Sequence, residues 1–214
     1  SKIREWLLED FGEAPLHFKT GEDSWCEAEV RAKSEGVLAG SPFLAPVFEE
    51  TQGLLALDRG NFPEIEWGKK EGESISAGEV LAAVRGYSQT LRKAERTALN
   101  VLSHMSEIAT NTAGLLRCLG EFPPAFRGII DTRKNRPGLR YFEKYAVRTG
   151  GAKNHRLGFF DGDLIKDNDI AAVGSIPLAI DEKWGGRYMV DVRIEVQNLE
   201  ELADVLEDGR VNMI

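Results

Sequence analysis

The spacing of apolar residues divides the chain into three stretches. Up to residue 86, short apolar runs alternate with glycines, which is typical of a small sheet with tight turns. We expect a helix over residues 1–13, with Ile3, Trp6, Leu7 and Leu8 on its apolar side, then strands near 26–32 and 36–39. Residues 69–86 predict a turn-strand-turn-strand unit, with bends at two of its glycines, Gly72 and Gly78. The first 86 residues therefore read as one structural unit.

From residue 90 to about 119 the apolar spacing changes to steps of three and four, which predicts one long amphipathic helix or two in succession. The stripe consists of Leu91, Ala94, Ala98, Leu102, Met105, Ala109, Thr112 and Leu116. Arg96 lies beside this stripe, and from the pattern alone it reads most simply as a solvated residue.

After residue 127, short apolar strands alternate with helical stretches, a pattern that predicts parallel β/α units. We expect strands at 128–131, 163–165 and 188–196, and helices at about 141–147, after residue 166 and after Asn198. Asn198 is a suitable N-cap for the last helix, Glu201 stands in the capping-box position, and Gly209 ends it.

Each of these strands leads into charged residues at its carboxyl end. Asp131, Arg133 and Lys134 follow the first, Lys166 follows the second, and Glu195 ends the third. In β/α barrels, active sites are built at that edge from several strands. These charged residues are therefore candidates for a common site.

The third strand also predicts which way its side chains point, because side chains alternate between the two faces of a strand. Val190, Val192, Ile194 and Val196 would pack on helices, leaving Glu195 directed into the barrel mouth. A buried carboxylate there requires a partner or a metal ion. The alternative is a salt bridge between Glu195 and a cation of a neighbouring strand.

Charge changes this picture in one segment. The chain has a net charge of −8, but residues 127–156 carry nine Lys or Arg against two acids, a local charge of +7. A long polyanion such as nucleic acid would be repelled by the remainder, whose charge is −15. We therefore expect this segment to form a pocket for a small anion. Gly150 and Gly151, followed by a basic cluster that includes His155 and Arg156, suit a carboxylate or a phosphate.

The sequence lacks the features that are typical of several other classes of protein. No apolar run is long enough for a membrane helix, and the first residues do not read as a secretory signal. The two cysteines, Cys26 and Cys118, favour a reduced cytosolic setting over a disulfide framework. His17, His104 and His155 are too widely spaced for a zinc pair. Dinucleotide, P-loop and GxSxG motifs do not occur.

Four ordered segments carry a family resemblance. ERTALN (95–100), DTRKNRPGLR (131–140), EKYAVRTGGAKNHR (143–156) and LIKDN (164–168) resemble quinolinate phosphoribosyltransferase, also called nicotinate-nucleotide pyrophosphorylase (carboxylating). EVLAAVRG and IEVQNLEE fit on either side, and the resemblance is weakest over residues 11–27. It implies an α/β fold, with an N-terminal α/β sandwich domain (1–88) followed by a β/α barrel domain (89–214) that is incomplete.

The resemblance also implies an activity. The family is a class of pentosyltransferase that makes nicotinate mononucleotide, pyrophosphate and CO2 from quinolinate and phosphoribosyl pyrophosphate, with Mg2+, in NAD biosynthesis. It implies a cytoplasmic homodimer or larger homo-oligomer, in which the N-terminal part of one subunit covers the barrel mouth of the other.

Residue roles follow from the same resemblance. Arg133, His155 and Arg156 would hold the carboxylates of quinolinate, helped by Arg96 of the neighbouring subunit. Thr132 would belong to the substrate-binding residues. Lys134 and Lys166 would face the ribose phosphates and the reacting centre, and Glu195 would serve the ribose hydroxyls or the magnesium. The catalytic candidates are thus Lys134, Lys166 and Glu195.

The end of the chain departs from the family pattern. RVNMI matches the start of a family strand that continues into Leu-Asp-Asn, whose aspartate is a further active-site carboxylate. We therefore expect a shortened form of the molecule or an incomplete sequence. Asp169 stands where the family has histidine, so no role passes to it. Two alternatives stay open: a related phosphoribosyltransferase for nicotinate or another carboxylated heterocycle, and a non-catalytic relative that binds anions.

Overall fold

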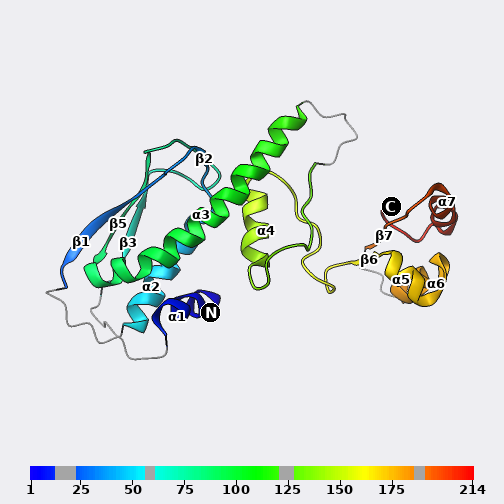
Figure 1. Cartoon of the computed structure of the whole chain (residues 1–214), viewed down its shortest axis with the longest axis horizontal. Helices are drawn as coiled ribbons and strands as arrows, with labels where there is room; N and C mark the ends of the chain where they lie inside the picture. The colour runs from blue at the N-terminus through cyan, green and yellow to red at the C-terminus, as the bar shows by residue number, and fades with distance from the viewer. Residues whose placement is uncertain (13–22, 56–60, 121–127, 186–190) are drawn as a thin grey trace. The chain divides into compact units, whose positions relative to one another are not determined.

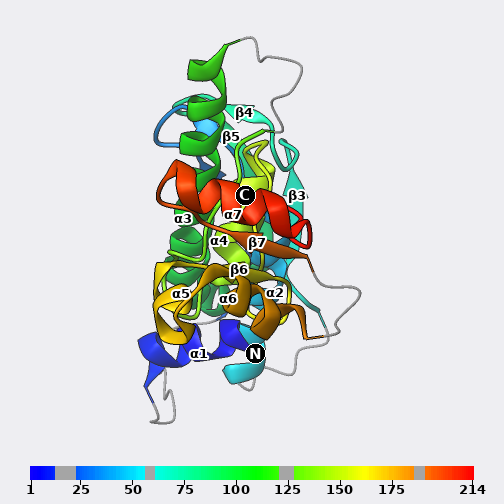
Figure 2. The same cartoon turned by 90° about the vertical axis from the view of Figure 1, so that its right-hand side faces the viewer.

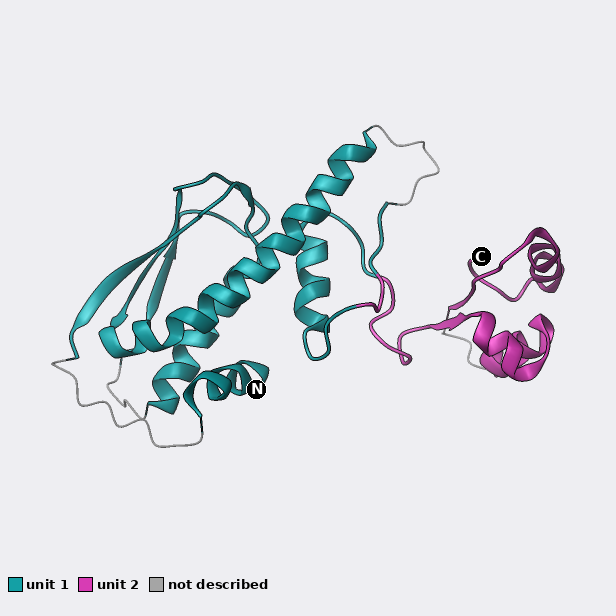
Figure 3. Cartoon of the chain, in the orientation of Figure 1, with its two compact units in different colours: residues 1–131, 135–154 teal, residues 132–134, 155–214 magenta. Residues whose placement is uncertain are grey.

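The structure is a computed structural model that describes residues 1–12, 23–55, 61–120, 128–185 and 191–214. The chain forms two compact units, shown in different colours in Figure 3. Unit 1 comprises residues 1–131 and 135–154, and unit 2 comprises residues 132–134 and 155–214. The predicted domain boundary after residue 88 stays a prediction, because the compactness of the units does not test it. His17 lies outside the described residues.

Unit 1 contains an antiparallel sheet in the order β1-β5-β3, formed by β1 (Trp25–Arg31), β5 (Val80–Tyr87) and β3 (Glu64–Trp67). A second pair joins β2 (Gly36–Val37) to β4 (Ser74–Ile75). The predicted bends are confirmed, since Gly72 and Gly78 have φ angles of 85° and 83°, which favour glycine. The strands expected near 26–32 and 36–39 are likewise present as β1 and β2.

The predicted amphipathic stretch is a single helix, α3 (Ser88–Leu119), which packs against α2 (Leu44–Leu54), α4 (Arg140–Thr149) and β2 (Figure 1). Seven of the eight predicted stripe positions are buried, and Leu116 is half-buried. α4 (Arg140–Thr149) covers the expected 141–147 helix and extends it at both ends. Apolar side chains of α1, α2, α3 and the sheet form the main core of this unit.

The N-terminal part of unit 1 differs from expectation in two respects. The first helix, α1 (Lys2–Phe11), buries Leu7 but leaves Leu8 exposed, so Leu8 is not on the apolar side. The pattern also gave no sign of α2 (Leu44–Leu54), of the short 3-10 helix η1 (Ser41–Phe43), or of β3. α2 buries polar Thr51 and Gln52 beside its apolar residues, which weakens its helical periodicity in the sequence.

Unit 2 contains the predicted parallel strands. β6 (Asp163–Ile165) pairs in parallel with β7 (Val192–Ile194) (Figure 2), and α5 (Asp167–Val173) and α6 (Ile176–Trp184) connect them in sequence. A second parallel bridge joins Arg193 to Met213. Val192 and Ile194 are buried in a core with residues of α6 and α7 (Leu199–Asp208), which confirms the predicted helix-facing side of the strand.

Two local expectations need correction. Residues 128–131 do not form a buried strand: Ile130 makes one isolated parallel bridge to Lys153, and its side chain is exposed. Asn198 caps α7 as predicted, and Gly209 ends it, but the Glu201 carboxylate accepts the backbone N–H of Gln197, not that of Asn198. Among the described helices, none combines the length and apolar character that a membrane crossing requires.

Candidate functional site

The clearest cluster of predicted residues lies at the carboxyl ends of the two parallel strands of unit 2. Lys166 directly follows β6, and Glu195 directly follows β7 and donates its backbone N–H to the carbonyl of Ile165 at 3.0 Å. Because the strands are parallel, both side chains emerge at one edge of the sheet. Lys166 Nζ lies 3.1 Å from Glu195 Oε2. The prediction that the strand ends meet is thereby confirmed for the second and third strands.

Glu195 differs from expectation in its environment. Its side chain is 52% exposed, and that of Lys166 is 47% exposed, so the carboxylate is not buried in this structure. It also forms the salt bridge to a neighbouring-strand cation that the sequence left open as the alternative. An exposed ion pair of this kind contributes little free energy, so each group can leave its partner and bind a substrate at little energetic cost.

Two predicted arginines gather around one aromatic ring, also within unit 2. The Cζ of Arg133 lies 3.9 Å from the centroid of the Phe159 ring, and the Cζ of Arg156 lies 5.4 Å from it. Both distances are within the range of attractive cation–π contacts. Arg133 lies in the 132–134 segment and Arg156 in the segment after the paired glycines, so chain segments more than 20 residues apart meet here.

Arg156 is held more firmly than its neighbour. Its Nη1 donates to the carbonyl of Gly162 at 2.8 Å, while its Nε is buried without a hydrogen-bond partner among the described residues. Burial lowers the pKa of Arg156, and the nearby Arg133 lowers it further, while Asp163 acts in the opposite direction. A guanidinium so surrounded has donors that an incoming carboxylate can satisfy.

The remaining predicted residues of unit 2 lie beside these groups in sequence. The Thr132 hydroxyl accepts the backbone N–H of Lys134 at 3.0 Å, which fixes the turn between them. Lys134 is exposed, and its side chain makes no ion pair within the described ranges. His155 is half-buried and precedes Arg156. Thr132, Lys134 and His155 thus join the other candidates in the same compact unit.

Arg96 belongs to unit 1 and is exposed on α3. It lines a hollow of about 420 Å³ together with Arg31 and Lys33 from the end of β1 and the turn after it. Its predicted role in a neighbouring subunit stays a prediction, because the structure contains one chain.

Only part of the basic segment 127–156 contributes to the candidate site, and its role as a pocket for a small anion stays a prediction. Lys144 is buried in unit 1, and its Nζ lies 2.5 Å from Asp131 Oδ1. Arg136 Nη1 lies 3.4 Å from the carboxylate of Glu143. The two acids of the segment therefore neutralise cations in unit 1, whereas Arg133 and Arg156 form no ion pair with a carboxylate of the described residues.

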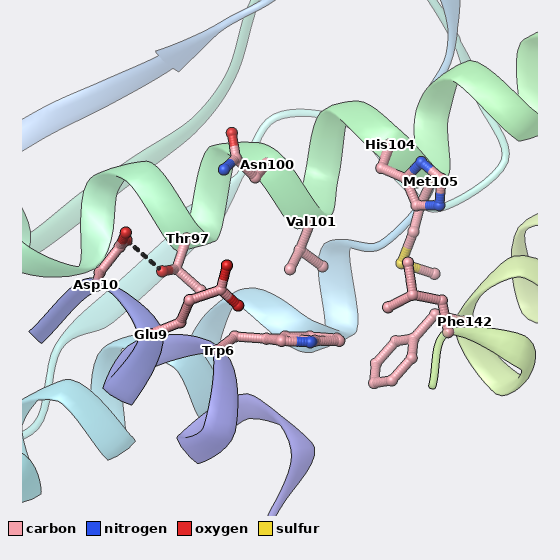
Figure 4. A pocket seen from close by; sticks show the side chains of 10 residues that line it. Trp6, Glu9, Asp10, Thr97, Asn100, Val101, His104, Met105 and Phe142 are labelled. Atoms are coloured by element: carbon pink, nitrogen blue, oxygen red, sulfur yellow. Dashed lines mark hydrogen bonds between the residues drawn. The ribbon is translucent and has the colours of Figure 1, made fainter. Parts of the chain in front are cut away.

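A separate pocket of about 280 Å³ lies between α1, α3 and α4 in unit 1 (Figure 4). Trp6, Glu9 and Asp10 contribute from α1, and Asp10 accepts a hydrogen bond from the Thr97 hydroxyl at 3.2 Å. None of the predicted site residues lines it. Its acidic and apolar lining is unsuited to an anionic substrate, so the candidate site is the cationic cluster of unit 2.

Three residues of this cluster were missed by the sequence analysis: Phe159, Asp163 and Arg193. Phe159 carries both cation–π contacts, and Asp163 raises the pKa of Arg156 while Arg193 lowers it. Phe159 lies only three residues after Arg156, and an aromatic residue beside a basic cluster is a signal that could have been used. Arg193 lies in β7 between the buried residues Val192 and Ile194, so strand alternation could have indicated that it points away from the core.

Comparison with protein families decides the relationship. The model of the quinolinate phosphoribosyl transferase C-terminal domain matches residues 108–214, and that of the N-terminal domain matches residues 16–106. The chain belongs to the quinolinate phosphoribosyl transferase family. The two matches together cover almost the whole chain, in the domain order that the resemblance implied.

Relatives within this family are similar over nearly the whole chain. A probable nicotinate-nucleotide pyrophosphorylase (carboxylating) of Bacillus subtilis is 39% identical, covering 97% of this chain and 68% of the relative. One from Synechocystis is 36% identical, covering 95% and 66%. The crystal structure of NadC from Streptococcus pyogenes superposes with a TM-score of 0.83 at 32% identity, covering 97% of this chain and 70% of that one. The chain thus spans about two thirds of the length of these relatives, and its α/β fold is that of the family.

Proposed function

We propose that this chain transfers the phosphoribosyl group of phosphoribosyl pyrophosphate to quinolinate, with release of pyrophosphate and CO2, to form nicotinate mononucleotide in NAD biosynthesis. Membership of the family supports the reaction. The observation that carries the residue assignment is the gathering of Arg133 and Arg156 in the same unit as the Lys166–Glu195 pair. The first pair suits a dicarboxylate, and the second suits a phosphorylated sugar.

Quinolinate carries two adjacent carboxylates, and each matches the planar fork of an arginine. In our proposal Arg133 and Arg156 bind these carboxylates, and His155 and the Thr132 segment complete the pocket. Arg96 of a second subunit adds a further cation. Support comes from the guanidinium donors of Arg133 and from Arg156 Nε, which have no hydrogen-bond partner among the residues that the structure describes.

Lys134 and Lys166 serve phosphoribosyl pyrophosphate in this proposal. Departure of pyrophosphate builds negative charge on oxygen, which positioned ammonium groups stabilise. The ribose carbon gains positive character at the same time, and the Glu195 carboxylate stabilises that charge or binds the ribose hydroxyls. The exposure of Lys166 and Glu195 supports this division, because both groups are accessible to substrate.

Magnesium fits the proposed site as a substrate-borne ion. Within the described ranges, no group of three or more His, Cys, Asp or Glu could hold a metal alone. Mg2+ is commonly bound by one or two carboxylates together with substrate phosphates, so a single carboxylate at this edge is compatible with it. Glu195 would hold the ion, which would neutralise charge on the departing pyrophosphate.

The proposal extends to architecture and assembly. The parallel pairing of β6 with β7, the helices between them and the bridge to Met213 support assignment of unit 2 to part of a β/α barrel. An N-terminal α/β sandwich domain would precede it. A homodimer, in which Arg96 reaches the neighbouring site, and a cytoplasmic location complete the proposal.

The test is CO2 release from quinolinate labelled at its 2-carboxylate. We expect release to require phosphoribosyl pyrophosphate and Mg2+, with nicotinate mononucleotide as the product. Nicotinate mononucleotide formed from nicotinate, without CO2, would instead support the alternative substrate. Arg133→Ala should abolish quinolinate binding, and an unchanged affinity in that variant would refute the assignment of Arg133.

A further inference from the structure

The contacts of Arg133 consist of a ring and little else. Its guanidinium lies 3.9 Å from the centroid of Phe159, and its side chain makes no hydrogen bond or ion pair to the residues that the structure describes. A long arginine side chain has many rotamers, and holding it in one costs conformational entropy. In this unit the Phe159 ring is the contact that offsets that cost.

The position of Phe159 is itself fixed by a tight turn. The backbone N–H of Leu157 donates to Asp161 Oδ2 at 2.8 Å, and Asp161 donates its N–H to the carbonyl of Gly158 at 3.4 Å. The Phe159 side chain is nevertheless 72% exposed. A ring so exposed contributes little to a hydrophobic core, and its contacts with Arg133 and Arg156 are the interactions that distinguish it from neighbouring Phe160.

Stacking on a ring has a particular advantage for an arginine that must bind a substrate. It uses the face of the guanidinium and leaves the five N–H donors, which lie in the guanidinium plane, available to a ligand. A carboxylate partner within the protein would also hold the arginine in place, but would occupy those donors. The ring therefore orders Arg133 without competing with an anionic ligand.

The same ring is shared with Arg156, whose Cζ lies 5.4 Å from the centroid. Two guanidiniums that approach one another repel, and this repulsion is one cause of the lowered pKa of Arg156. The negative π face of a phenyl ring attracts both cations and offsets part of the repulsion. The ring thus contacts two guanidinium groups, one for each carboxylate of the proposed dicarboxylate substrate.

We propose that Phe159 is a positioning residue that holds Arg133 and Arg156 in place for the two adjacent carboxylates of the substrate. The inference rests on the proposed function, which supplies quinolinate as the dicarboxylate. It adds a residue that acts through the arginines and makes no contact with the reacting atoms.

Phe160 provides a matched control. It is the next residue, its side chain is 75% exposed, and its ring lies close to Gly158 without a cation–π contact to any arginine in the described part of the chain. We expect Phe159→Leu to raise the KM for quinolinate by about 3- to 30-fold, which is the range that such contacts give. The kcat, the KM for phosphoribosyl pyrophosphate and the melting temperature should change little. Phe159→Tyr should restore the affinity, and Phe160→Leu should leave it within about twofold.

Two results would overturn the proposal. One is an equal KM for quinolinate in Phe159→Leu and Phe160→Leu; the other is a parallel loss of kcat, both KM values and thermal stability, which would indicate a structural role. A ligand-independent measurement separates this proposal from the proposed function. Side-chain 15N relaxation of Arg133 should show an ordered guanidinium in the wild type and in Phe160→Leu, but a mobile one in Phe159→Leu. If relaxation is unchanged, Phe159 does not position Arg133, whatever reaction the enzyme catalyses.

Discussion

Two lysine–carboxylate pairs in this chain have similar chemistry and opposite environments. In unit 1, Lys144 and Asp131 meet at 2.5 Å with side chains only 3% and 10% exposed. In unit 2, Lys166 and Glu195 meet at 3.1 Å with side chains 47% and 52% exposed. Sequence analysis placed Asp131, Lys166 and Glu195 at strand ends and counted Lys144 only as one of the cations of the basic segment. The structure places the two pairs in different units, one buried and one exposed.

The buried pair is useful to the fold because its geometry is fixed. Asp131 also donates its backbone N–H to the carbonyl of Lys153, so the Lys144 side chain anchors the segment that leads to the site. A buried ion pair adds little net stability, yet removal of one partner leaves an uncompensated charge. The exposed Lys166–Glu195 pair has the reverse properties. Its removal should lower the stability of the fold little, while it removes two groups of the proposed site. Loss of each lysine should therefore affect different measurements.

The largest expected effect is on stability. Lys144→Met should lower the free energy of unfolding by about 3–5 kcal/mol, because it leaves the Asp131 carboxylate buried without its cation. Urea denaturation, followed by circular dichroism, measures this change. Lys144→Met combined with Asp131→Leu removes both charges and should recover a large part of the loss. A double variant no more stable than the single one would show that packing of the lysine stem, and not its charge, dominates.

The second effect is on catalysis. Lys166→Met should lower kcat by about 100- to 1000-fold, the range found when one group that stabilises transition-state charge is removed. Its free energy of unfolding should fall by less than about 1 kcal/mol, because the pair with Glu195 is exposed. Lys69, which lies 2.9 Å from Glu79 in unit 1, offers the control. Lys69→Met should change neither kcat nor the free energy of unfolding appreciably. An equal loss of kcat in both variants would refute the assignment of Lys166 to the site.

The comparison also explains which parts of the fold could be predicted. α3 and the β6–β7 pair were found because their apolar residues keep one period, as in Leu91, Ala94 and Ala98 along α3. α2 was missed because Thr51 and Gln52 are buried within it and break that period. Ile130 was assigned to a buried strand because two adjacent isoleucines resemble one, yet its side chain is exposed. Local pattern cannot report such tertiary context.

The site shows the same division. Lys166 and Glu195 were placed together correctly, because parallel strands bring their carboxyl ends to one edge. Burial could not be predicted for the charged residues: Lys144 and Lys134 both read as basic residues of one segment, and only the first is buried. The contact of Arg133 with Phe159 depends on how two segments distant in sequence fold together. The periodicity of apolar residues carries no information about such a contact.

A third, smaller effect concerns the shape of a cation. Arg156→Lys should weaken quinolinate binding by about tenfold, because one ammonium cannot replace the bidentate fork, although the charge is kept. Calorimetric titration measures the affinity. Arg117→Lys, at an exposed arginine in the last turn of α3, is the matched control and should bind as the wild type does. Equal affinities in the two variants would mean that charge alone, and not fork geometry, recruits the substrate.

The smallest effect tests an ion pair of intermediate exposure. Asp208, 11% exposed, meets Arg210, 33% exposed, at 2.6 Å, and Arg210 also reaches Asp181 of α6. The hydrogen bond from Arg210 lowers the pKa of the Asp208 carboxyl below its ordinary 3.8. This contribution to stability is therefore present above pH 3.8 and is lost as the pH falls through the lower folded-state pKa.

Asp208→Asn should accordingly lower the melting temperature at pH 7 by no more than about 3 °C. The difference from the wild type should shrink only in acid, as the pH falls below the ordinary pKa of an aspartate. Scanning calorimetry at neutral and acidic pH measures it. A difference that stayed constant across that range would mean that packing of α7, and not the charge of Asp208, is responsible. The stability effect of the Asp208–Arg210 pair would then not lie between those of the buried Lys144–Asp131 pair and the exposed Lys166–Glu195 pair.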